Sequence, residues 1–444
     1  MPLHALNAAA IASASSSGVA KSLSDAARFC KESRWLAKAN QYSSDTIKSI
    51  DDDISNNTLN KRYLAQYIAV STLLHATDGW SYLGRSIQSL MQGDPHRALH
   101  MAYYAELRAA MSLLATEGIG VFDRKHFVVD GRNSVVVLPK RSGTHQFAWD
   151  ALNNWAQSAS SGLAFAEVIR PHNRTLEDWL YPVGGGAAVL PQAQSWFKQW
   201  GMDLSVIADD RESRNVRSYR PSGLPAPWTV KADDAIGFVT DLWAVLEPSS
   251  SSFEALDRHI LRLSVASLFR GRKRGQPVST NPRFLAYVQS VVANQDLSEA
   301  VSSQWKKFLT RESDRLDPAV IRFSTYPSQD SAFNAFGVIS RATLLLRMAT
   351  GMTHKLFETA GVANESLDFW RSDVGLSRGF WDGTAKPEAM TDLWSDIAAA
   401  TTEAEPFLEQ LTPEQRNFRV LSAGFGQILL PFGGCERVAL WGVL

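Results

Sequence analysis

A cluster of polar side chains in the segment DDRESRNVRSYRP, residues 209–221, is the first candidate for chemistry in the sequence. Its members recur with gaps of one, three or four residues, so a helix would place them along roughly one face: Arg211, Arg214, Asn215 and Tyr219. An arginine on that face can hold a phosphate through two parallel hydrogen bonds. The spacing favours a phosphate-binding site, and the alternative is a solvated ion-pair face with Tyr219 as a half-buried anchor.

A second polar face lies in the earlier segment HMAYYAELRAAMSLLATEGIG, which begins at His100. His100, Tyr104 and Arg108 follow one another at four-residue steps and therefore share a helix face, whereas Glu106 points elsewhere. If this helix and the 209–221 helix are neighbours, their polar faces form one pocket that could bind nucleic acid.

These two segments, together with His145 in GTHQFAWDALNNW, resemble in order and character the helices of the HEPN superfamily. The resemblance covers roughly residues 60–221. HEPN proteins are small four-helix proteins common among prokaryotic toxins and antiviral systems, and their Arg and His form an RNA-cleaving site that two subunits usually share. The resemblance implies that Arg214, Asn215 and Tyr219 occupy the catalytic positions, that RNA or a nucleotide is the ligand, and that the protein is a homodimer.

The sequence departs from the HEPN pattern at Tyr219, because the family has a histidine there. Metal-independent RNA cleavage needs a group that exchanges a proton near neutral pH and a cation that stabilises the phosphorane, and His plus Arg supply both. A tyrosine with an ordinary pKa near 10 is a poor base. The resemblance thus implies a binding or regulatory site whose catalytic power is open.

A second Arg–His pair, Arg347 and His354, formally satisfies the HEPN spacing in the segment LLLRMATGMTHKLF. However, Arg347 is followed by Met348 rather than by a polar residue, and Gly351 should weaken the helix that aligns the pair. We therefore expect a solvent-facing arginine and a histidine at a helix end.

The densest positive run is RGRKRG, residues 270–275, with Arg272, Lys273 and Arg274. Such a run after an apolar helix is typical of an arm that contacts phosphates, and the alternative is a solvated loop. If the run acts together with Arg211 and Arg214, salt should weaken binding steeply, because each phosphate contact releases counterions.

No other motif indicates catalysis, a metal or a cofactor. Four further histidines are each expected to be structural or exposed: His126, His145, His172 and His259. No metal-ligand spacing links them, HExxH does not occur in the sequence, and no Gly-x-Ser-x-Gly stretch makes a convincing nucleophile elbow. The Gly-rich stretch LYPVGGGAAVLP lacks a following Gly-Lys-Ser/Thr and is predicted to be a loop.

The elements that must position these residues are mainly helices, because apolar residues recur at three- and four-residue spacing from Ser24 onward. The predicted helical segments are 24–39, 62–91, 96–119, 144–159, 192–221, 257–269, 281–295, 298–313, 334–357 and 387–400. Thr144 is the predicted N-cap of its helix. One β-hairpin is expected near 119–138, where β-branched residues flank Asp130-Gly131-Arg132-Asn133.

The domain prediction follows from the breakers in SGLPAPW, which indicate a boundary near residue 225. An Ala/Ser-rich segment occupies residues 1–23, a HEPN-like helical domain residues 24–225, and a second α-helical domain residues 226–444. The fold class is thus mainly α. Arg108 and Arg341 open similar Ala/Leu-rich stretches, which either mark a similar central helix in each half or resemble one another by chance.

The composition is that of an ordinary globular protein, with 45 Lys+Arg, 45 Asp+Glu and 45% hydrophobic residues among 444. Zero formal net charge argues against bulk coating of nucleic acid, so any such contact must be local. Cys30 and Cys435 lack CxxC spacing, which fits a reducing cytoplasm, and no apolar run is long enough to span a membrane. Most tryptophans should seal helix interfaces: Trp80, Trp149, Trp155, Trp196, Trp200, Trp370, Trp381 and Trp394.

Two functional hypotheses follow. The first is a defence or toxin-type protein that binds RNA or a nucleotide, with ribonuclease activity as an extension. The second is a non-enzymatic subunit that assembles with other proteins of a defence complex. An assembly subunit should expose a large apolar patch, whereas a nuclease requires a concave basic pocket.

Overall fold

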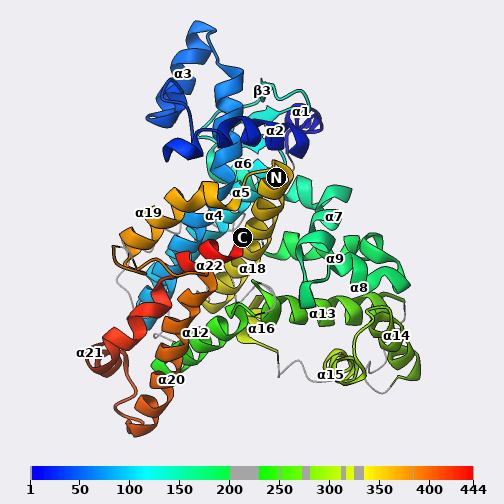
Figure 1. Ribbon diagram of the computed structural model, residues 1–444, viewed down its shortest axis with the longest axis vertical. Helices are drawn as coiled ribbons and strands as arrows, with labels where there is room; N and C mark the ends of the chain where they lie inside the picture. The colour runs from blue at the N-terminus through cyan, green and yellow to red at the C-terminus, as the bar shows by residue number, and fades with distance from the viewer. Residues whose placement is uncertain are drawn as a thin grey trace.

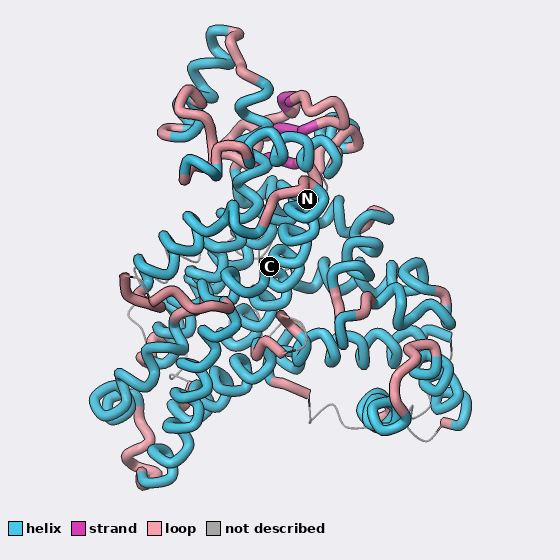
Figure 2. Tube along the Cα trace, viewed as in Figure 1, coloured by secondary structure: helices cyan, strands magenta, loops and turns pink. Residues whose placement is uncertain are grey.

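The described part of the protein is mainly α-helical, with one small antiparallel sheet (Figure 2). The computed structural model describes residues 3–200, 230–249, 252–272, 281–311, 317–324, 335–383 and 385–443, without the side chains of 270–272 and 425. Figure 1 shows three arms around α4 and α18: one with α3 and the sheet, one with α13–α15, and one with α12, α20 and α21. The predicted boundary near residue 225 lies outside the described residues.

The bounds of the helices before residue 201 are α1 (Ala5–Ile11), α2 (Ser16–Ala27), α3 (Thr46–Asn56), α4 (Lys61–Met91), α5 (Pro95–Thr116), α6 (Thr144–Ala156), α7 (Ala159–Val168), α8 (Leu176–Leu180) and α9 (Gly185–Trp200). Later helices are α12 (Ala232–Leu246), α13 (Glu254–Arg272), α14 (Pro282–Ala293), α15 (Glu299–Leu309), α16 (Ala319–Ser324), α18 (Ala335–Thr359), α19 (Asp368–Arg378), α20 (Trp394–Gln410), α21 (Phe418–Leu429) and α22 (Glu436–Gly442). Short 3₁₀ turns include η1 (Cys30–Glu32), η2 (Gln41–Ser43), η7 (Asn364–Leu367) and η9 (Leu430–Gly433).

Three long helices, α4, α5 and α18, form the centre of the molecule. Each of α4 and α5 begins where the sequence supplies a cap: Asn60 accepts from the Tyr63 backbone N–H, and Asp94 accepts from that of Arg97 with Pro95 next to it. The indole N–H of Trp80 donates to Thr350 Oγ1 at 2.9 Å and joins α4 to α18. One apolar core cluster contains residues from Ile11 to Val443 and so includes both predicted domains.

The sheet confirms the predicted hairpin and adds a short strand to it. Strands β1 (Ile119–Gly120), β2 (Phe127–Val129) and β3 (Val135–Val137) are antiparallel in the order β1-β2-β3, with Val128 opposite Val136. The Asp130 side chain accepts from the Arg132 and Ser134 backbone N–H groups in the turn, as an Asx turn requires.

Several local predictions were wrong. Helices already begin at Ala5 and Ser16, before Ser24. The predicted helix over 24–39 ends at Ala27, and the short turn η1 that follows ends at Ser33, which takes a left-handed conformation with φ 54°. Thr144 is not an N-cap, since its hydroxyl donates to the Phe122 and Asp123 carbonyls and Gly143 holds the cap position.

The Gly-rich stretch is also not a loop, because α9 begins at Gly185. The Glu177 carboxylate accepts a hydrogen bond from the Gly186 backbone N–H at the start of this helix. A Cβ at Gly185 or Gly186 would lie within 2.4 Å of Glu177, so the glycines make room for this carboxylate. An acidic side chain of the protein itself thus sits where a phosphate loop would hold its ligand.

The tryptophan prediction holds in the described residues. Trp80, Trp155, Trp200, Trp370 and Trp381 are buried, and Trp149, Trp196 and Trp394 pack half-buried against the core. Cys30 and Cys435 are free thiols and are buried. Among the described helices, none combines the length and apolar character that crossing a membrane would require.

Candidate functional site

The 209–221 cluster cannot be placed, because Arg211, Arg214, Asn215 and Tyr219 lie outside the described residues. The same holds for Lys273 and Arg274 of the basic run, while Arg272 is the last residue of α13 and its side chain is not described.

The three residues predicted to share a face of α5 do so. The His100 and Tyr104 rings touch edge to face, with centroids 5.0 Å apart, and Tyr104 stacks on Tyr82 of α4 at 5.4 Å. Arg108 lies one turn further along, where its Nη1 donates to Nδ1 of His75 at 2.9 Å. The face therefore packs largely against α4, and its other expected partner lies outside the described residues.

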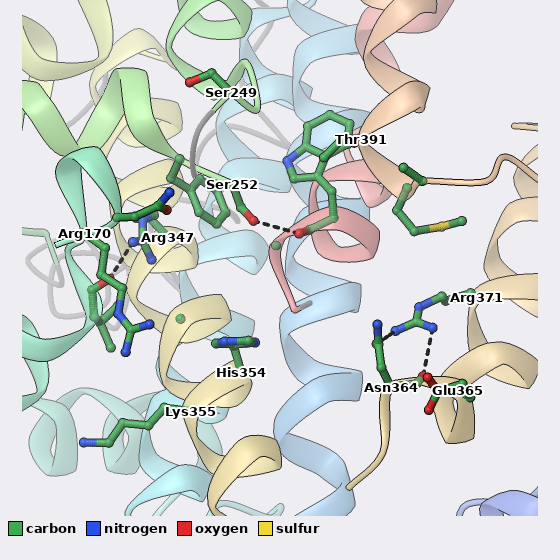
Figure 3. A pocket seen from close by; sticks show the side chains of 18 of the residues that line it. Arg170, Ser249, Ser252, Arg347, His354, Lys355, Asn364, Glu365, Arg371 and Thr391 are labelled. Carbon is green, nitrogen blue, oxygen red and sulfur yellow. Dashed lines mark hydrogen bonds between the residues drawn. The ribbon is translucent and has the colours of Figure 1, made fainter. Parts of the chain in front are cut away.

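The second Arg–His pair was expected to be a solvent-facing arginine and a histidine at a helix end, but the structure brings both residues to one cavity. Helix α18 runs unbroken through Gly351, and both Arg347 and His354 line a cavity of about 690 Å³. Figure 3 shows Arg170, Arg347 and Lys355 on one side of His354, and Asn364 and Arg371 on the other. Arg347 is 4% exposed and is not the solvent-facing arginine that we expected.

Arg347 is held rigidly by hydrogen bonds to neighbouring helices. Its Nε and Nη2 donate to the two carboxylate oxygens of Asp257 at 2.8 and 2.7 Å, and Nη2 also donates to the Val168 carbonyl at 2.7 Å. The guanidinium carbon lies 4.4 Å from the centre of the Phe253 ring. These contacts fix the side chain and leave Nη1 as the guanidinium nitrogen without a hydrogen bond to another described residue.

Gly351 explains how the pair is aligned. A Cβ at this position would lie 2.2 Å from Cγ1 of Val168 and 2.6 Å from Nη1 of Arg347. The glycine thus allows α7 to approach α18 closely and leaves room for the guanidinium of Arg347 along its own helix. The cost of a glycine in the helix, about 1 kcal/mol, is small beside the packing of a buried helix.

His354 is oriented for proton transfer. Its Nδ1 lies 3.1 Å from the Val443 carbonyl, which can only accept, so Nδ1 carries the proton. In this neutral tautomer Nε2 keeps its lone pair, and no hydrogen bond joins it to another residue that the structure describes. The ring is half-buried. It can therefore act as a base.

Further cations and anions line the same cavity, with five Lys or Arg against four Asp or Glu residues. Lys355 pairs with Glu167, and burial lowers the pKa of Lys355 although Glu117 and Glu358 oppose this effect. Arg371 pairs with Asp368 and donates to Asn364. Arg170 is exposed, and its Nε donates to the Glu167 carbonyl at 3.1 Å. Arg170 is thus the cation most available to a ligand.

One buried donor at the cavity lacks a partner among the described residues. Trp441 lines the cavity and is 1% exposed, and its indole Nε1 makes no hydrogen bond. A buried donor without a partner is costly, so an acceptor group on a ligand could stabilise it.

The remaining histidines have structural roles, as expected. His126 is fully buried, stacks on Phe147 and accepts from the Phe122 backbone N–H; burial lowers its pKa to about 4. His145 bonds the Tyr103 hydroxyl, His172 packs against Trp305, and His259 pairs with Asp317. Across the described ranges, no group of three His, Cys, Asp or Glu side chains is placed to hold a metal ion.

Comparison with known proteins gives no further guide, since no family model, curated protein or solved structure matches the chain. The spacing of Arg347 and His354 is visible in the sequence, but the low helix propensity of Gly351 argued against their alignment. Arg170, Lys355 and Arg371 carried no signal, because their meeting depends on how α7, α18 and α19 pack.

Proposed function

We propose that the protein binds a phosphate group of RNA or of a nucleotide in the cavity lined by Arg347 and His354, which we call the α18 cavity, and that His354 acts there as the base of a metal-independent ribonuclease. The observation that carries this proposal is that Arg347 and His354 line one cavity together with Arg170. The setting in prokaryotic defence, and a homodimeric state, are proposed from the HEPN resemblance alone.

The residues supply the groups that the reaction needs. Nε2 of His354 accepts the proton of a ribose 2′-hydroxyl, whose oxygen then forms a bond to phosphorus. The bond from phosphorus to the 5′-oxygen breaks, and this oxygen takes a proton from water. Arg170 and the Nη1 edge of Arg347 stabilise the charge that develops on the phosphorane. The products are a 2′,3′-cyclic phosphate and a 5′-hydroxyl.

Cleavage of a labelled single-stranded RNA by the purified protein tests the proposal. His354→Asn can retain a donor toward the Val443 carbonyl but has no base, so we expect the rate to fall at least about 100-fold. His4→Ala is the control, because His4 caps α1 and lies outside the cavity. Equal rates for wild type and His354→Asn would overturn the proposed role.

The 209–221 cluster stays a prediction and enters the same experiment as Arg214→Ala. If Arg214→Ala abolishes cleavage while His354→Asn does not, the activity belongs to the cluster that the HEPN resemblance indicates.

The alternative of a non-enzymatic assembly subunit gains less support from the described residues. The large apolar side chains that are exposed come from many separate elements: Leu6, Ile47, Val136, Val137, Leu163, Tyr181, Leu285, Leu376 and Leu430. An assembly surface of the expected kind would gather such side chains into one patch.

A further inference from the structure

A second cavity, of about 540 Å³, lies beside the helix face of Arg108 and shares no lining residue with the α18 cavity. Its walls come from the start of α3, from α4 and α5, from β1 with the loop that follows it, and from Thr144 at the start of α6. The volume is in the range of small-molecule sites, about 300–1,000 Å³. We call it the Arg108 cavity.

Arg108 and His75 supply the side-chain nitrogen atoms that line the Arg108 cavity, beside aspartate, serine and threonine side chains. Because the guanidinium can only donate, its bond to Nδ1 of His75 fixes the proton of the imidazole on Nε2. Burial, and secondarily the charge of Arg108, lower the pKa of His75 to about 3, so the ring stays neutral at physiological pH. His75 thus offers an N–H donor, and Nε2 has no hydrogen bond to the described part of the chain.

Arg108 keeps charge available to a ligand. Its one ion pair with a described carboxylate is to Asp78 at 3.5 Å, where both side chains are partly exposed, at 31% and 52%. Partly exposed ion pairs of this kind typically contribute less than about 1 kcal/mol to stability, so a ligand can compete for the arginine. Asp78 does not line the cavity, whereas Arg108 does. A donor and a cation therefore face the cavity from adjacent helices.

The apolar residues that line the Arg108 cavity favour a ligand with a flat, apolar ring. The Tyr67 and Phe122 rings lie side by side, with centroids 5.9 Å apart and an interplanar angle of 34°, and Met111, Val121 and Ile47 complete the apolar lining. Aromatic side chains of this kind stack on planar ligands.

Two acidic residues, Asp45 and Asp123, also line the cavity and are exposed. With one arginine against two carboxylates, each further negative charge on a ligand adds repulsion, so the cavity disfavours a polyanion such as nucleic acid or a polyphosphate. A ligand with a single negative charge can instead reach the Arg108–His75 pair.

We propose that the Arg108 cavity binds a small planar molecule with one carboxylate, which accepts hydrogen bonds from Arg108 and His75 while its ring packs against Tyr67 and Phe122. This site is separate from the proposed phosphate site, and the two proposals fail independently.

Calorimetric titration of the full-length protein with 2-naphthoate tests this proposal, with 2-naphthamide as the neutral counterpart and 2-naphthyl phosphate as the dianion. We expect the carboxylate to bind at least tenfold more tightly than either. Arg108→Gln should weaken its binding at least tenfold, whereas Arg170→Ala, in the other cavity, should leave it unchanged.

Circular dichroism and the melting temperature confirm that Arg108→Gln is folded before its affinity is measured. A second variant, Phe122→Ala, removes part of the apolar wall without touching the charged pair and should weaken both naphthoate and naphthamide. Failure of 2-naphthoate to bind at millimolar concentration, equal affinity for the amide, or unchanged affinity in Arg108→Gln would each overturn the proposal.

Discussion

At the residue scale, the two Arg–His pairs differ in what their imidazoles can do. His75 accepts a hydrogen bond from an arginine, and burial together with that charge keeps it neutral down to acid pH. His354 instead donates from Nδ1 to a main-chain carbonyl, which leaves Nε2 as a base. The pair that the sequence argument set aside is therefore the one suited to proton transfer, and only the hydrogen-bond partners reveal it.

The depressed pKa of His75 predicts a pH dependence of stability. Above the ordinary histidine pKa of about 6.5, neither the folded nor the unfolded state protonates this ring. As the pH falls from about 6.5 toward about 3, His75 binds a proton in the unfolded state but stays neutral in the folded state. The free energy of unfolding therefore decreases over this range. Denaturant titrations between pH 7 and pH 4 should show a smaller loss of stability in His75→Gln than in the wild type. Parallel curves for the two proteins would contradict the assignment.

At the element scale, the sequence predicted α4, α5, α6, α13, α14, α15 and α18 because their apolar spacing is regular and caps such as Asp94-Pro95 are local. It failed where a contact distant in sequence decides the conformation. The Glu177 carboxylate accepts from the Gly186 backbone N–H at the start of α9, and α2, whose start was missed, packs at Gly18 against the Asp130 turn. The α18 cavity could not be predicted for the same reason, since its lining comes from separate helices.

The fit of α7 against α18 gives a test at this scale. Gly351→Ala would place a Cβ 2.2 Å from Val168, so we expect a loss of about 1–3 kcal/mol in the free energy of unfolding from overpacking. Gly237→Ala in α12 is the matched control, because its Cβ would meet nothing within 4 Å and alanine favours a helix by about 1 kcal/mol. Urea unfolding gives the free energy of unfolding of both variants. If Gly351→Ala stabilises the protein as much as Gly237→Ala does, α7 does not pack on Gly351.

At the scale of the whole molecule, the two predicted halves share one core. Helix α18 packs along α4 and α5, and Arg341 and Glu106 form an ion pair between α18 and α5 at 3.7 Å with both side chains fully buried. The Trp80 indole of α4 donates to Thr350 of α18 at 2.9 Å and likewise joins the two halves. The similar stretches opened by Arg108 and Arg341 lie on two helices that pack against each other, which the sequence could not indicate.

This shared core predicts that the chain unfolds in one cooperative thermal transition. Thr350→Val leaves the buried Trp80 indole without an acceptor and should cost about 1–3 kcal/mol. Scanning calorimetry should show the whole transition moving to lower temperature in this variant. Two separate transitions, of which only one shifts, would instead indicate two independent domains.

The central claim is that the α18 cavity binds phosphate, and one measurement addresses it directly. Fluorescence anisotropy with a labelled eight-nucleotide single-stranded RNA gives the affinity of the wild type, of Arg170→Ala and of Arg283→Ala, which replaces an exposed arginine outside the cavity. We predict that Arg170→Ala weakens binding at least tenfold and reduces its dependence on salt, whereas Arg283→Ala changes neither. Equal affinities for all three proteins, or no binding by the wild type, would contradict the account.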